Sequence, residues 1–211
     1  MCELTFLRHG ESEGVQDNIL QGHIDLQLTE KGRNQIRNLS NYWMRNGQTF
    51  DSIITSPLKR AKETGEIVAS CLHISEVCQD MLWIERNFGA GEGVKLQQIT
   101  DWYQPQTMPT VFEPIYDSGE TEWQVHMRAG KAINQLMLCK KKNLLIVSHG
   151  NIINAALHLI IGVLPSGRTL PIEFALEPGC YAKVRYRSDT GRWSLVTFND
   201  HAFVNHTIAT D

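Results

Sequence analysis

Short apolar stretches alternate along this chain with longer stretches in which hydrophobic residues recur at helical spacing. Apolar, β-forming residues predict strands at 3–7, at 50–55, near Val77 and at 143–148. Of the intervening helices, one is predicted to begin after Thr29 as N-cap, and the next is predicted to have Pro57 in its first turn. Two more are predicted at 120–140 and 151–161. Strands that alternate with helices favour a mainly parallel sheet covered on both faces. The predicted fold is therefore α/β, a three-layer α/β/α sandwich.

The end of the chain has a different pattern. Stretches 181–187 and 193–198 read as strands joined by a hairpin turn at 188–191, which predicts antiparallel strands at one edge of the sheet. Lys140, Lys141 and Lys142 are expected to close the 120–140 helix, where positive charge suits its dipole. No repeat, low-complexity tract or linker interrupts residues 1–211, so one domain is expected.

The least regular stretch lies between the predicted helices, at about 94–117. It holds several aromatic residues, namely Trp102, Tyr103, Phe112 and Tyr116. We expect this stretch to form a wall or lid over a substrate, although its aromatics fit a small satellite core equally well.

Composition narrows the classes of partner and compartment. A net charge of -3 gives no reason to expect nucleic acid. Five cysteines without CxxC spacing indicate reduced thiols in a cytoplasmic protein. No signal peptide is evident at the N-terminus, and the apolar run 144–164 is broken by His149, Gly150, Asn151 and Asn154. Since a membrane span needs about 20 mostly apolar residues, no membrane partner is expected.

Two histidines follow predicted strands and precede glycine. His9 comes directly after the first strand, and His149 directly after the strand at 143–148. In open α/β sheets ligands bind outside the carboxyl ends of the strands, so both imidazoles are expected at one edge. Gly10 and Gly150 let the backbone approach an anion closely.

Two arginines are expected at the same edge. Arg8 precedes His9, and Arg60 lies early in the helix that follows the strand at 50–55. Two guanidiniums beside two imidazoles form a cation cluster suited to the oxygens of a phosphoryl group.

A phosphatase with such a cluster also needs a proton donor for the leaving alcohol. Glu85, which follows the short strand near Val77, is the best-placed carboxylate. Apolar Trp83 and Phe88 nearby, and a bound dianion, would favour its protonated form. Each of these residues taken alone is more often structural, and the prediction rests on their convergence.

The ordered set of motifs resembles the histidine phosphatase superfamily, also called the phosphoglycerate mutase-like family. The resemblance covers essentially the whole chain. It runs through LRHGES at 7–12, QG at 21–22, LTEKG at 28–32, SPLKRA at 56–61, Glu85 with FG at 88–89, GET at 119–121 and VSHG at 147–150.

The resemblance implies a phosphoglycerate mutase-like fold and a role for each residue. His9 is similar to the nucleophile that becomes phosphohistidine, with Arg8, Arg60 and His149 holding the phosphoryl oxygens and Glu85 acting as general acid and base. Substrate-binding positions are implied for Ser12, Gln21, Gly22, Gly150 and Asn151. The expected partner is a small phosphorylated metabolite, no cofactor is implied, and a homodimer is left open. Neutral His9 needs a free lone pair, so its other nitrogen is expected to donate to a carbonyl.

One position departs from the family pattern. Many members carry Asn a few residues after the signature, where this chain has Val15. Either Gln16 or Asn18 substitutes for it through a different loop, or one phosphate contact is missing. The departure bears on the substrate and not on the class of chemistry.

Other catalytic classes fit poorly. Cys2 and Arg8 have the spacing of cysteine-dependent phosphatases, but a strand would separate them by roughly 20 Å. No GxSxG elbow, Walker loop or HExxH spacing is present, so no metal site is expected.

Within the family, the alternative to a phosphatase is a phosphoglycerate mutase. Residues 93–119 contain one basic residue, Lys95, and suit a second phosphate poorly, which favours the phosphatase. A phospho-ligand-binding member without turnover is the alternative from a different class.

Overall fold

The computed structural model describes residues 1–102, 110–166 and 172–200. A six-stranded sheet runs through the molecule in the order β3-β2-β4-β1-β5-β6. Its strands are β1 Cys2–Arg8, β2 Ser52–Thr55, β3 Val77–Gln79, β4 Asn143–Ser148, β5 Tyr181–Arg187 and β6 Arg192–Phe198. Strands β3, β2, β4 and β1 are parallel, whereas β5 and β6 add antiparallel pairs at one edge. The α/β prediction with an antiparallel edge is confirmed.

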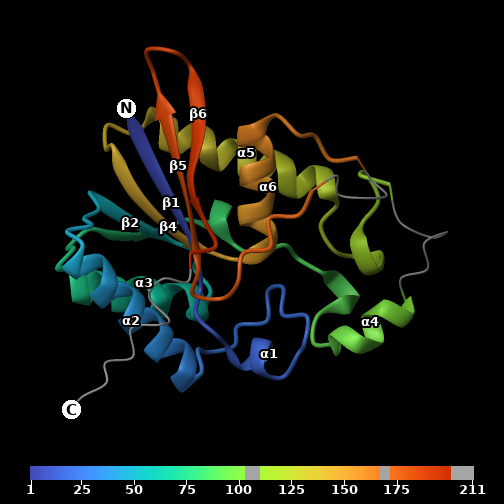
Figure 1. The fold of residues 1–211 in the computed structure, drawn as a ribbon. Helices are drawn as coiled ribbons and strands as arrows, with labels where there is room; N and C mark the ends of the chain where they lie inside the picture. Colours follow the sequence, from blue (N-terminus) through green and yellow to red (C-terminus); the bar gives the residue numbers. More distant parts are fainter. Residues whose placement is uncertain (103–109, 167–171, 201–211) are drawn as a thin grey trace.

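Helices cover both faces of this sheet (Figure 1). Helices α2 Glu30–Arg45 and α3 Lys59–Leu72 pack together on one face, and α5 Glu122–Leu138 and α6 Gly150–Ile161 pack together on the other. Shorter elements are α1 Glu13–Gln16, α4 Leu96–Trp102, and the 3₁₀ turns η1 Met81–Trp83, η2 Gly89–Gly91 and η4 Ile115–Asp117. None of the helices in the described ranges is long and apolar enough to cross a membrane.

The two strands at the centre of the sheet explain the most apolar segments of the sequence. In β1 and β4, Leu4, Phe6, Leu144 and Ile146 are almost completely buried, because helices cover the sheet on both sides. The two strands pair in parallel with Arg8 opposite Ser148. His9 and His149 therefore leave the sheet side by side, and the backbone N–H of His9 donates to the carbonyl of Ser148 at 3.0 Å.

Local signals in the sequence predict the ends of the helices with mixed success. The Thr29 side chain caps α2 by accepting from the backbone N of Gly32, as predicted. Pro57, however, lies outside α3, because Leu58 is the N-cap and Lys59 the first helical residue. The lysines at 140–142 also lie beyond the helix, since α5 ends at Leu138 with Cys139 as its C-cap.

The stretch 94–117 is described in part. Helix α4 lies in the first half of this stretch. Two aromatic residues in its second half, Phe112 and Tyr116, each pack against another aromatic ring. Phe112 lies 5.7 Å from Trp123 between ring centroids, and Tyr116 lies 6.4 Å from Phe88. Tyr103 lies outside the described residues, and the role of this stretch as a substrate wall stays a prediction.

Candidate active site

The imidazoles of His9 and His149 face each other at the carboxyl ends of β1 and β4. Their ring centroids are 5.1 Å apart, and both side chains are buried. The pKa of His9 lies well below its usual value, mainly because the ring is buried and also because the Arg60 and Arg8 guanidiniums are close to it. Burial also lowers the pKa of His149 in the same direction, again with Arg60 as the next cause. Both rings are therefore neutral at neutral pH.

One nitrogen of His9 is fixed by the backbone. Nδ1 lies 2.7 Å from the carbonyl oxygen of Gly10, which can only accept, so Nδ1 carries the proton and donates. The backbone N–H of Gly10 in turn donates to the hydroxyl of Thr64 in α3, at 3.2 Å. This tautomer leaves the lone pair of Nε2 available as a nucleophile.

Two arginines flank these rings, each held by backbone carbonyls. Nη1 of Arg8 donates to the carbonyl of Leu176 at 2.8 Å. Nη1 and Nη2 of Arg60 donate to the carbonyls of Ile24 and Gly22, each at 2.8 Å. Burial lowers the pKa of Arg60 to about 10 and also lowers the pKa of Arg8, which leaves Arg60 charged at neutral pH. The side chains point fixed positive charge into the site.

Three buried nitrogen atoms in this cluster have no hydrogen-bond partner among the described residues. They are Nε of Arg8, Nε of Arg60 and Nδ1 of His149. The other nitrogen of His149, Nε2, lies 2.7 Å from the hydroxyl of Ser56, at the end of β2. Leaving a buried polar atom unpaired costs about 1–3 kcal/mol, so three such nitrogens in one cluster, two of them on guanidiniums, indicate a site built for an acceptor-rich anion.

The carboxyl of Glu85 lies at the N-terminus of α6, close to the same cluster. Its Oε1 accepts from the backbone N–H of Arg86 at 2.8 Å and of Ile152 at 3.3 Å. Oε2 lies 3.4 Å from the backbone N and 3.5 Å from the Nδ2 of Asn151. The charge of Glu85 acts on both Arg8 and Arg60. The predicted convergence of Glu85 with the cationic residues is thus present in the fold.

The two aromatic residues expected near this carboxyl each pack against another ring. Trp83 packs into the core against Phe6, with ring centroids 5.6 Å apart, and Phe88 packs against Tyr116. The carboxyl oxygens of Glu85 themselves lie among N–H donors, and an influence of the two rings on its protonation stays a prediction. The sequence could not show this, because it places both aromatics near Glu85 without their direction.

A further arginine, which the sequence analysis did not single out, holds the segment that carries Glu85. Arg128 of α5 donates to three carbonyls of this segment, those of Leu82 at 3.0 Å, Ile84 at 2.6 Å and Glu85 at 3.2 Å. Its guanidinium also forms an ion pair with Glu120, at 2.7 Å. The sequence signal that could have pointed to Arg128 is the GET motif at 119–121, because it contains Glu120, the ion-pair partner of Arg128.

A second missed residue contacts the same Glu85 carbonyl. His23 Nε2 donates to the carbonyl of Glu85 at 2.8 Å, and the backbone N–H of His23 donates to Glu92 at 2.9 Å. Gly22 before it has φ +50°, and a Cβ there would lie 2.1 Å from Oε1 of Glu92. The positive φ and the close approach explain why glycine stands at this position.

The remaining predicted binding residues fall into two groups. Gly150 and Asn151 form the first turn of α6, next to Arg8 and Glu85. Ser12 and Gln21 pair with each other, since the Ser12 hydroxyl donates to Oε1 of Gln21 at 2.9 Å. Val15 lies in α1 and Asn18 lies just beyond it, and both Gln16 and Asn18 are exposed.

Beside the cation cluster lies a cavity of about 410 Å³. Arg8, Glu85 and Asn151 line its inner end, and Glu173 and Glu177 lie on the segment before β5 that forms another wall. Within the described ranges, no three His, Cys, Asp or Glu side chains gather in a metal-binding arrangement.

Comparison with known proteins identifies the family. The sequence profile of the histidine phosphatase superfamily, branch 1, matches residues 4–201. The chain is 31% identical over 204 residues to the uncharacterized phosphatase PhoE of Bacillus subtilis, across 95% of this chain and 97% of that protein. It is 28% identical over 172 residues to a 2,3-bisphosphoglycerate-dependent phosphoglycerate mutase of Bartonella henselae, across 76% of this chain and 82% of the mutase.

Solved structures show the same fold. The phosphoserine phosphatase of Entamoeba histolytica, solved with 3-phosphoglyceric acid, superposes with a TM-score of 0.80 at 24% identity, covering 97% of this chain and 100% of that one. The profile match spans nearly the whole chain, and the relatives include phosphatases and mutases. The chain is therefore an enzyme of the histidine phosphatase superfamily, branch 1.

Proposed function

We propose that this enzyme is a phosphatase that hydrolyses small phosphomonoesters through a phosphohistidine on His9. The observation that carries the proposal is the set of three unpartnered buried nitrogens, on Arg8, Arg60 and His149, in one cluster with a neutral His9. A phosphoryl group has three equatorial oxygens for such donors to hold, and the nucleophile lies in their midst.

In the first step, Nε2 of His9 attacks the phosphorus and the bond from phosphorus to the alcohol oxygen breaks. Nε of Arg8, Nε of Arg60 and Nδ1 of His149 donate to the phosphoryl oxygens as negative charge shifts among them. Glu85 gives its proton to the departing alcohol oxygen. The bound dianion favours this protonated form, because it adds negative charge close to the carboxyl.

In the second step, water replaces the alcohol. The Glu85 carboxylate takes a proton from water, the water oxygen bonds to phosphorus, and the bond between phosphorus and Nε2 of His9 breaks. Inorganic phosphate leaves, and both His9 and Glu85 return to their starting protonation. Two in-line displacements of this kind need mainly positioning and positive charge.

The same cations support a metal-independent reaction. Arg8 and Arg60 supply the positive charge that bound Mg²⁺ supplies in other phosphoryl-transfer enzymes. We expect activity to be unchanged after dialysis against a chelator. Loss of activity that returns with added Mg²⁺ or Zn²⁺ would contradict this part of the proposal.

The charges around the site favour a phosphatase over a mutase. Lys95 is the one basic residue within 93–119, and its ammonium group donates to the carbonyl of Asp17 at 2.7 Å. Glu173 and Glu177 line the cavity where a second anionic group of a bisphosphorylated ligand would lie. Incubation with 3-phosphoglycerate and a bisphosphoglycerate primer decides the question. Formation of 2-phosphoglycerate without release of phosphate would establish the mutase.

Hydrolysis of p-nitrophenyl phosphate tests the proposal itself. Wild type and a control variant, His73→Asn, are expected to release phosphate, whereas His9→Ala releases none above the buffer rate. His73 is exposed in a left-handed conformation at the end of α3, which asparagine tolerates. No His9-dependent release across a panel of phosphate esters would favour a phospho-ligand-binding protein instead.

A further inference from the structure

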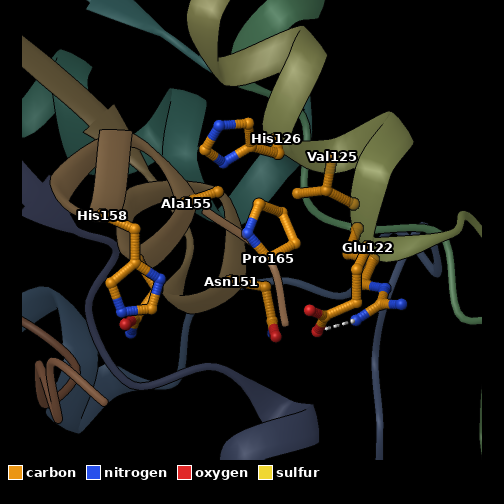
Figure 2. Close-up of a pocket in the computed structure, with 9 residues that line it drawn as sticks. Glu122, Val125, His126, Asn151, Ala155, His158 and Pro165 are labelled. Atoms are coloured by element: carbon orange, nitrogen blue, oxygen red, sulfur yellow. Dashed lines mark hydrogen bonds and ion pairs between the residues drawn. The ribbon is translucent and has the colours of Figure 1, made fainter. Parts of the chain in front are cut away.

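A small second cavity lies between α5 and α6, next to the candidate active site (Figure 2). His126 and Val125 reach it from α5, and Asn151, Ala155 and His158 reach it from α6. Its volume is about 50 Å³. It shares Asn151 with the larger cavity that contains Arg8 and Glu85, so the two adjoin.

His126 is the notable group in this cavity. Only 7% of the residue is exposed, and among the described residues its ring has no hydrogen-bond partner. The ring stacks on Trp123, with centroids 6.0 Å apart and planes at 23°. Burial, with the nearby His158, lowers the pKa of His126, so the ring is neutral at neutral pH. A neutral imidazole presents one donor and one acceptor.

The other polar groups of the cavity already have partners. Arg86 is paired with Glu122 across 3.4 Å, drawn as the dashed line in Figure 2. Both ends of the Asn154 amide bond the backbone of Phe174, at 2.8 and 2.9 Å. Nε2 of His158 donates to the carbonyl of Ile172 at 2.6 Å. The cavity thus offers no unpaired charge, and the ring of His126 is free to bind a ligand.

Size and charge together select the ligand. The ion pair is closed and the imidazole is neutral, so the cavity has no free charge to attract an anion or a cation. A hydroxyl group, in contrast, can accept from the N–H of the imidazole or donate to its other nitrogen. A water needs about 10–15 Å³ of such volume, so the cavity holds a few hydroxyl-sized groups and excludes a nucleobase.

We propose that this cavity binds the terminal hydroxyl groups of the leaving alcohol, which makes phosphate esters of polyols and open-chain sugars the preferred substrates. The inference rests on the proposed phosphatase function. The phosphoryl group lies against His9, the carbon chain passes Asn151, and the far hydroxyls reach His126.

Two esters of equal chain length test the inference, mannitol 1-phosphate and hexyl phosphate. His126→Phe keeps the aromatic stack and removes both hydrogen-bonding nitrogens, His126→Gln keeps a donor and an acceptor, and His73→Asn serves as the histidine control. We expect His126→Phe to lower kcat/KM for mannitol 1-phosphate by about tenfold, which corresponds to about 1.4 kcal/mol, and to leave hexyl phosphate unchanged. His126→Gln should retain most of the preference.

Equal effects of His126→Phe on both esters, or no effect on either, would overturn the inference while leaving the phosphatase intact. Absence of turnover of both esters by wild type would instead count against the phosphatase. Titration calorimetry with the His9→Ala variant then still tests the cavity. Tighter binding of mannitol 1-phosphate that His126→Phe removes supports the cavity, and equal binding of both esters by both forms rejects it.

Discussion

His9 and His149 occupy matching positions at the ends of two adjacent parallel strands, with their ring centroids 5.1 Å apart. The register of β1 against β4 sets this relationship, because Arg8 lies opposite Ser148 and the next residue of each strand is histidine. Both rings are buried beside arginines, which keeps them neutral. The stability of the fold and the readiness of the nucleophile therefore depend on the same two groups.

The first prediction concerns stability against pH. The pKa of each ring is lowered in the folded protein, whereas an unfolded histidine has a pKa of about 6.5. Below that value the unfolded chain binds more protons, so stability is lost as pH falls. Each histidine contributes up to about 1.4 kcal/mol per pH unit.

Urea unfolding at pH 7.5 and 5.5 measures this loss. The loss should be smaller by up to about 1.4 kcal/mol in His149→Gln, which lacks one of the two groups. An identical loss in wild type and variant would contradict the assignment.

The second prediction concerns proton donation by Glu85. Glu85→Gln keeps the size of the side chain and removes the proton that the leaving alcohol needs. We expect kcat for an alkyl phosphate to fall by about 100- to 10,000-fold, because general acid catalysis contributes that much. p-Nitrophenyl phosphate, whose leaving group needs little protonation, should lose much less at this step. Equal losses for both substrates would show that Glu85 does not donate the proton.

The third prediction concerns Arg128, which positions Glu85 without reaching the substrate. Arg128→Ala leaves the carbonyls of Leu82 and Ile84 without this donor, removes one of the two donors to the Glu85 carbonyl, and breaks the ion pair with Glu120. The free energy of unfolding should fall by about 2–4 kcal/mol, and kcat for an alkyl phosphate should fall more than kcat for p-nitrophenyl phosphate.

Arg128→Lys is the matched variant for this position. It restores the charge opposite Glu120 but not the three carbonyl contacts, so it should recover stability better than activity. Loss of stability with the ratio of the two kcat values unchanged would mean that Arg128 serves the fold alone.

The sequence predicted most of the fold for identifiable reasons. Strands β1 and β4 are mostly apolar in their middle because both faces of the sheet are covered, and the cap of α2 is a side chain that binds the backbone three residues on. Pro57 was placed wrongly, since a proline that suits a first helical turn also suits the loop just before it. Local propensity does not distinguish these two positions.

The central cluster of the site could also be predicted from the sequence, whereas the residues that support it could not. Parallel strands end at one edge, which is enough to bring His9 and His149 together. Arg128 and His23 act on carbonyls of the Glu85 segment from positions 43 and 62 residues away. Every residue has a backbone carbonyl, so a side chain that binds one has no recognisable partner residue in the sequence. Only the three-dimensional structure shows such contacts.

The fourth prediction uses two glycines with positive φ. Gly22 and Gly47 have φ of +50° and +66°, but a Cβ at Gly47 would meet nothing within 4 Å, whereas one at Gly22 would collide with Glu92. Gly47→Ala should lower the free energy of unfolding by about 1–2 kcal/mol, because alanine is strained in this left-handed backbone conformation, and should leave kcat unchanged.

Gly22→Ala should in addition displace the carbonyl that holds Arg60, and so lower kcat/KM by at least about tenfold. Thermal unfolding and steady-state kinetics of the two variants provide the comparison. Full activity of Gly22→Ala would show that the Gly22 carbonyl does not position Arg60.

The central claim is that His9 carries the phosphoryl group on Nε2, because Nδ1 is committed to the carbonyl of Gly10. Rapid mixing with substrate, quenching in alkali and mass spectrometry of the digested protein tests it most directly. The expected product is an acid-labile phosphohistidine at His9, with NMR of the trapped protein placing phosphorus on Nε2. Phosphate release with no covalent adduct, or an adduct on another residue, would contradict the account.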